Sequence, residues 1–222
     1  MCGRFTQSQS ASTIAATFHV ATVPDLLPRY NIAPTQPVPA ILVSEELAER
    51  ELRQLRWGLI PSWAKDSSMA ARMINARAET VAEKPAFRTA FRQRRCLIVA
   101  DGFYEWQRLE RKKQPFYYRL QDQQPFAFAG LWERWQSPEG DPIDSCTILT
   151  TQANELLAQI HDRMPVILPP DSYNLWLDPT VRQAEQLQPL LQPYPADAMT
   201  AYPVSTKVNS PAYDQAECIN SL

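Results

Sequence analysis

The chain has 222 residues, 45% of them hydrophobic, and a formal net charge of −2. This length and composition predict one compact domain, residues 1–222, with a core of its own. No apolar run approaches the ~20 residues that span a bilayer, and the charged opening differs from a signal peptide, so we expect a cytoplasmic protein without membrane contact. The four cysteines show neither a CxxC pair nor zinc-ligand spacing, which predicts a reducing compartment and no metal.

The charge is divided unevenly along the chain. Residues 1–120 carry 18 Lys and Arg against 11 Asp and Glu, a net +7, whereas residues 121–222 carry 4 against 13, a net −9. The first part is therefore suited to an anion, and its basic residues are mostly arginine, the better fork for phosphate. The alternative is that the two halves attract each other within the fold, and charge alone does not choose between them.

The hydrophobic pattern predicts many short strands with interspersed helices. Strands are expected over 40–44, 52–60, 96–100, 103–108, 116–120, 126–132, 145–151, 166–168 and 201–205. Helices are expected over 10–19, from 83 onward, and over 154–159, 171–177 and 179–192. The dipeptide at 101–102 is predicted to be a hairpin turn. Because helices and strands do not alternate strictly, the sequence favours an α+β fold with a mainly antiparallel, barrel-like sheet and peripheral helices.

Several polar and aromatic positions allow two interpretations. The helix from residue 83 would turn four arginines outward, possible anion contacts that need be no more than a solvated face: Arg88, Arg92, Arg94 and Arg95. If 75–79 is a strand, Asn75, Arg77 and Glu79 share one face, which is either a solvated edge or the floor of a site. Trp57 and Trp63 flank a proline-terminated strand, where they are either core residues or stacking platforms for bases.

Cys2 carries the most distinctive chemistry in the sequence. If Met1 is removed, Cys2 presents an α-amine and a thiol on adjacent carbons, with ordinary pKa values of about 8 and about 8.5. The amine can condense with an aldehyde to a Schiff base, and the thiol can close on that imine to a thiazolidine. The alternative is that a second-position cysteine is chance.

Glu105 and His161 are the candidates for proton transfer. Glu105 stands among Phe103, Tyr104 and Trp106, an apolar setting that would raise the pKa of its carboxyl; it is otherwise an outward-facing residue of an alternating strand. His161, one of only two histidines, lies between a predicted helix and an apolar strand, where it would project into a pocket or serve only structure.

Several short words together resemble one known family. They are Met1–Arg4, Arg29–Pro34, Trp57–Trp63, Asn75–Thr80, Ala100–Trp106, Phe128–Glu133, Thr147–Asn154 and His161–Leu168. In this order they resemble the SRAP family, the abasic-site processing proteins also called SOS-response-associated peptidases. The resemblance runs from residue 2 to about 218. It implies a barrel-like core with a positively charged groove for single-stranded DNA, and a covalent link between the N-terminal cysteine and the aldehyde of an abasic site.

The resemblance also implies a role for each matching residue. Cys2 is the nucleophile after Met1 removal, Asn75 positions the reacting amine or sugar, Glu105 is the acid and base, and His161 assists opening of the deoxyribose ring. The implied DNA contacts are Arg4 and Arg77 at phosphate or sugar and Trp57 and Trp63 near the displaced bases. No metal or organic cofactor is required, the protein would be a monomer, and it would join the nucleoid during DNA damage.

Three other activities fit parts of the pattern. Met-Cys-Gly also resembles the N-terminal-nucleophile glutamine amidotransferases, but their oxyanion holes use glycine-rich loops and this chain has five glycines in all. The family's older name suggests a peptidase, and Cys2, Glu105 and His161 could remove Met1 themselves. The third alternative is a non-catalytic module for single-stranded DNA in which Cys2 is incidental. Loss of the covalent adduct without loss of binding on changing Cys2 would separate that module from an enzyme.

Overall fold

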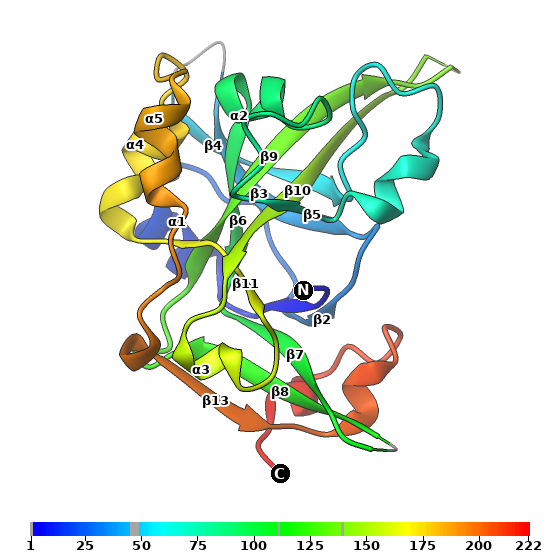
Figure 1. The fold of residues 1–222 in the computed structure, drawn as a ribbon, viewed down its shortest axis with the longest axis vertical. Helices are drawn as coiled ribbons and strands as arrows, with labels where there is room; N and C mark the ends of the chain where they lie inside the picture. The colour runs from blue at the N-terminus through cyan, green and yellow to red at the C-terminus, as the bar shows by residue number, and fades with distance from the viewer. Residues whose placement is uncertain (1, 45–48, 111, 139) are drawn as a thin grey trace.

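Five strands of the computed structural model close into a barrel (Figure 1). The structure describes residues 2–44, 49–110, 112–138 and 140–222, so Met1 and part of the charged segment 45–51 lie outside it. Neighbouring strands follow the circuit β10-β4-β3-β6-β9 and back to β10, with only the β4–β10 pairing parallel. Their bounds are β3 Pro37–Val43, β4 Arg50–Trp57, β6 Arg95–Ala100, β9 Phe126–Gln136 and β10 Pro142–Gln152. The prediction of an α+β fold with a mainly antiparallel, barrel-like sheet is confirmed.

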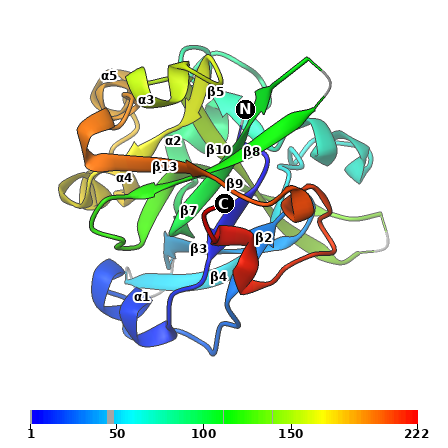
Figure 2. The ribbon, with the colours of Figure 1, turned by 90° about the horizontal axis from the view of Figure 1, so that it is seen from below.

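Short strands extend the barrel, and a second sheet packs below it. β5 (Asn75–Arg77) runs parallel to β10, while β11 (Arg163–Pro165) and β12 (Ile167–Leu168) join β10 and β9. The second sheet is antiparallel throughout, in the order β13-β8-β7-β1-β2. Its strands are β1 Phe5–Gln7, β2 Arg29–Ile32, β7 Gly102–Arg108, β8 Lys113–Leu120 and β13 Met199–Pro203. Figure 2 shows the C-terminal segment, residues 204–222, lying against the outer side of this sheet.

Alternation along the barrel strands creates two cores. In β6, Cys96, Ile98 and Ala100 join the barrel interior, whereas Leu97 and Val99 face the helices outside. The interior core continues onto the second sheet through Phe5 and Phe103, which ties the two sheets together. The helices are α1 Ala11–Phe18, α2 Arg88–Gln93, α3 Glu155–Ala158, α4 Tyr173–Leu177 and α5 Ala184–Leu187. Cys96 and Cys146 are fully buried.

The predicted hairpin turn at residues 101–102 is wrong. β6 ends in the barrel and β7 begins in the second sheet, so this point is a crossing between sheets. The Asp101 amide donates to the carbonyl of Thr6 at 3.0 Å, and its carboxylate accepts from the Thr6 hydroxyl, so the crossing is fastened to β1. A Cβ at Gly102 would lie 2.1 Å from the Tyr117 hydroxyl. Glycine is needed here for that close approach and not for a turn.

Two helix predictions differ from the structure. The segment 179–192 holds only the four residues of α5 and a 3-10 turn, because Thr180 folds back onto Asp178 and Pro189 cannot continue an α-helical ladder. The helix from 83 begins at Arg88 and not at its first expected residue. Arg95, expected outside, is buried because it already belongs to β6. Its guanidinium donates to three backbone carbonyls, one of them that of Trp176 at 2.6 Å, and burial lowers the pKa of Arg95 to about 10.

Candidate active site

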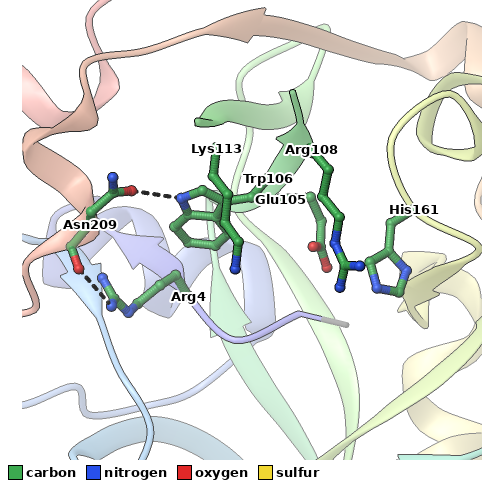
Figure 3. Close-up of a pocket in the computed structure, with 7 residues that line it drawn as sticks. All are labelled: Arg4, Glu105, Trp106, Arg108, Lys113, His161 and Asn209. Atoms are coloured by element: carbon green, nitrogen blue, oxygen red, sulfur yellow. Dashed lines mark hydrogen bonds between the residues drawn. The ribbon is translucent and has the colours of Figure 1, made fainter. Parts of the chain in front are cut away.

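A cavity of about 400 Å³ opens between the second sheet, the loop after α3 and the C-terminal segment (Figure 3). It is lined by Arg4, Glu105, Trp106, Arg108, Lys113, His161 and Asn209. The structure thus brings together three of the residues that the sequence singles out, from positions 4, 105 and 161. The other four lining residues were not anticipated. Trp106 and Asn209 are held by a hydrogen bond of 2.7 Å from the indole nitrogen to the amide oxygen.

Cys2 lies buried at the start of the chain, next to this cavity. The Asn75 side-chain amide donates to the Cys2 carbonyl at 2.9 Å, and the Cys2 thiol points to the carbonyl of Arg4 at 3.9 Å. Burial first, and then the nearby charge of Glu105, raises the pKa of the Cys2 thiol far above its ordinary value. The thiol is therefore protonated at neutral pH. A base must take its proton before or during attack.

Glu105 is the base that the structure offers near Cys2. It is 4% exposed, on β7 opposite Phe116, so its surroundings are largely apolar. Burial raises the pKa of the Glu105 carboxyl, because the charged form loses its hydration. The expectation of a raised pKa is confirmed, and the outward-facing alternative does not apply. A carboxyl of this kind exchanges protons at a higher pH than an exposed one.

His161 is held at the cavity by the loop between α3 and β11. Its amide donates to the carbonyl of Leu157 at 2.9 Å, and its Nδ1 accepts from the Arg163 amide at 3.0 Å. Nδ1 also lies 2.9 Å from a carboxylate oxygen of Asp162. Because Nδ1 accepts the Arg163 hydrogen bond, the neutral ring carries its proton on Nε2.

Asn75 and Arg77 both lie on β5 but have different surroundings. The NH2 group of Asn75 donates to the Cys2 carbonyl. Its Oδ1 is buried and accepts no hydrogen bond from any residue that the structure describes. Arg77 is exposed and forms no ion pair within the described ranges. Glu79 lies beyond the strand and accepts two hydrogen bonds from the Arg163 guanidinium. Of the three residues predicted to share one strand face, only Asn75 and Arg77 therefore belong to the strand.

Arg4 is bound to protein atoms at the wall of the cavity. Its guanidinium donates to Asn31 Oδ1 at 2.6 Å and to the carbonyl of Val208 at 2.8 Å, and it lies 5.9 Å from the centre of the Trp106 ring. Partial burial lowers the pKa of Arg4. These contacts tie the chain start to β2 and the C-terminal segment, which fixes the position of Cys2.

The two candidate tryptophans differ completely in exposure. Trp57 is fully buried, with its indole nitrogen donating to the Ile74 carbonyl at 2.9 Å and its ring 5.1 Å from that of Phe5. Its faces belong to the core, so the core interpretation holds and no base can stack there. Trp63 is 59% exposed, so its ring is accessible to a base.

We therefore expect truncation of these two rings to change the free energy of unfolding by very different amounts. Trp57→Ala removes a fully buried indole and should lower the free energy of unfolding by about 3–5 kcal/mol. Trp63→Ala should change it by less than about 0.5 kcal/mol, because a surface ring contributes little to folding. Urea denaturation of both variants measures the difference, and equal losses would contradict the packing described here.

Comparisons with known proteins place this chain in one family. The SOS response associated peptidase (SRAP) family matches residues 1–211. The chain is 48% identical over 225 residues to abasic site processing protein YoqW of Bacillus subtilis (strain 168), and 31% identical over 229 residues to abasic site processing protein YedK of Escherichia coli (strain K12), with 100% of each chain covered. The crystal structure of a protein from Bacteroides thetaiotaomicron matches with a TM-score of 0.90 over 100% of both chains, at 27% identity. The chain belongs to the SRAP family.

Two features are absent from the described residues. No cluster of His, Cys, Asp and Glu within the ranges given above has the composition to hold a metal ion. Across the same ranges, no helix has both the length and the apolar character needed to cross a bilayer.

Proposed function

We propose that this protein recognises abasic sites in single-stranded DNA and links itself to them covalently through Cys2 once Met1 is removed. The observation that carries the proposal is the setting of Cys2. The Cys2 carbonyl accepts a hydrogen bond from Asn75, and the charge of Glu105 adds to the rise in the pKa of the Cys2 thiol. Glu105 and His161 line the same cavity. The names of the relatives YoqW and YedK, both abasic site processing proteins, agree with this substrate.

The reaction requires two bonds to form and one water to leave. The α-amine of Cys2 adds to the C1′ aldehyde of the open sugar, and loss of water gives an imine. The Cys2 sulfur then adds to the imine carbon while its proton passes to the imine nitrogen, which gives a thiazolidine without any change of oxidation state. The buried Asn75 Oδ1 is suited to accept a hydrogen bond from the α-amine. This contact would orient the lone pair of the amine nitrogen towards the aldehyde.

Glu105 and His161 supply the proton transfers in this scheme. The raised pKa of Glu105 suits it to donate a proton to the departing water and to take one from the thiol, whose own pKa is too high for spontaneous ionisation. His161 would serve the ring oxygen of the closed sugar, which must be protonated as the aldehyde forms. Closure of the thiazolidine ring removes the imine. The imine is the electron sink that drives loss of the β-phosphate and strand cleavage, so its removal protects the strand.

DNA binding should depend on salt through the exposed arginine of β5. We expect Arg77→Ala to weaken binding of an undamaged single strand and to reduce the slope of log K against log salt by about 0.7, the value for one lost phosphate contact. Titration of a fluorescent oligonucleotide at several salt concentrations measures both quantities. Arg88→Ala, at an exposed position on α2, is the matched control. An affinity that does not change with salt concentration would contradict the proposed phosphate contact.

Removal of Met1 is the step at which a peptidase activity would enter. We propose that Cys2, Glu105 and His161 can carry out this cleavage themselves, which would serve to mature the protein. Expression of Glu105→Gln in cells and intact mass measurement test this directly: retention of Met1 in the variant but not in the parent supports self-cleavage. Full removal in both assigns the step to a separate aminopeptidase, and leaves the crosslinking proposal unchanged.

A further inference from the structure

Two cations face each other at the mouth of the cavity. β7 and β8 pair in antiparallel register up to Arg108 opposite Lys113, and both residues line the cavity that holds Glu105 and His161. Figure 3 shows their side chains extending from neighbouring strands into the same space. Neither residue forms an ion pair with a described residue, including Glu110 just beyond β7 in the chain.

This arrangement is unfavourable for the protein alone. Like charges directly opposite on an antiparallel pair repel each other, and an acidic residue at either position would remove the repulsion. Arg4 adds a third cation to the same lining, although its donors are largely committed to Asn31 and Val208. Among the lining residues only Glu105 is acidic, and burial raises its pKa and so disfavours its charge. The space between Arg108 and Lys113 is therefore electrically suited to an anion.

We propose that Arg108 and Lys113 form a subsite for the DNA phosphates that flank the abasic sugar. Arg108 lines the same cavity as His161, whose proposed partner is the sugar ring, so a phosphate held here would be one directly attached to that sugar or its neighbour. The guanidinium gives a two-pronged contact and the ammonium a point charge. The inference rests on the proposed function, since it assigns a binding role around the same reacting sugar.

Neighbouring lysines make a direct test of the subsite. Lys112 is exposed, immediately precedes β8 and does not line the cavity, so Lys112→Ala removes the same charge one residue away. Lys113→Ala and Arg108→Ala should each weaken binding of an abasic-site oligonucleotide by about fivefold at 0.1 M salt and lower the salt slope by about 0.7. Lys112→Ala should do neither. Equal effects of Lys112→Ala and Lys113→Ala would reduce the subsite to diffuse attraction and overturn it.

Neutral phosphates locate the contact. A methylphosphonate placed singly at the phosphates around the abasic site removes one charge from the DNA at a time. At the contacted phosphate the parent should lose affinity, and Lys113→Ala or Arg108→Ala should lose nothing further, because the partner is already missing. Additive losses at every phosphate would exclude a specific contact.

Reversing one charge separates binding from folding. Arg108→Glu replaces a like-charge pair by an opposite one, so the unfolding midpoint at low salt should stay the same or rise while DNA affinity falls. A fall in both would make the residue structural and overturn the proposal. Crosslinking by the parent is measured in the same series. If the parent forms no crosslink, the proposed function is wrong. If the parent crosslinks normally and the three cavity variants keep the parent's affinity, only the proposed subsite is wrong.

Discussion

Replacing Cys2 by Ala should abolish the stable DNA adduct without abolishing the reaction with the aldehyde. In a mature Cys2→Ala protein the α-amine remains, and Asn75 can still hold the backbone carbonyl of residue 2, because that contact does not involve the thiol. An imine should therefore form and be trapped by borohydride. Left unreduced, it should dissociate or cleave the strand, whereas the parent should give a heat-stable adduct on an intact strand. A labelled abasic oligonucleotide on a denaturing gel measures all of these species.

An N-terminal extension is the complementary control for Cys2. It buries the α-amine in a peptide bond and should prevent both the imine and the stable adduct. A stable, unreduced adduct from Cys2→Ala would exclude the thiazolidine. An adduct from the extended protein would exclude the α-amine. Equal binding by the parent and Cys2→Ala, with no adduct from either protein, would leave only the single-strand binding module.

Removing either proton-transfer group should slow crosslinking strongly. We expect Glu105→Gln and His161→Ala each to reduce the rate by about 10²–10⁴-fold at saturating DNA, the range typical of general acid–base groups. Affinity for undamaged single-stranded DNA should change little, because neither residue is proposed as a phosphate contact. His19→Asn is the matched control, since His19 is the other histidine, is exposed, and ends α1 with a φ of 53° that asparagine tolerates. Parent rates in both variants would return Glu105 and His161 to structural roles.

Glu105→Gln should also make the protein more stable at neutral pH. The folded pKa of Glu105 lies above its ordinary value of 4.5, so the folded state binds more protons than the unfolded state in the window above that value. Stability is consequently lost as pH rises through this window, and glutamine removes the loss. Thermal unfolding of the parent and the variant between pH 4 and 8 should show the two curves separating towards higher pH. Parallel curves would contradict a raised pKa.

The fold was predictable where local pattern decides it. The hydrophobic pattern in residues 96–100 and 103–108 identifies two strands, and the order of predicted helices and strands identifies the fold class. The path between them was not predictable, because dipeptide 101–102 has turn chemistry, whereas the carboxylate and amide of Asp101 bind Thr6 of β1, 95 residues earlier in the chain. Likewise Arg95 reads as part of an exposed helix, and only its carbonyl acceptors around α4 show why it is buried.

The candidate site was predictable through its chemistry and not through its shape. Cys2, Asn75, Glu105 and His161 stand out because amines, thiols, carboxyls and imidazoles carry reactions. Lys113 was missed because the second hairpin strand was expected to begin at 116, and without the true register nothing places that lysine opposite Arg108. Trp57 and Trp63 have similar surroundings in sequence, and only the closed barrel separates the buried ring from the exposed one.

Intact mass spectrometry of the purified protein, with and without an abasic oligonucleotide, tests the central claim most directly. One measurement reads both the state of the N-terminus and the covalent adduct. The account predicts a free protein lighter by one methionine residue, and an adduct whose mass is the sum of protein and oligonucleotide minus one water, stable to heat and not requiring reduction. A mature protein that yields no adduct, or an adduct that survives blocking of the Cys2 amine, would contradict it.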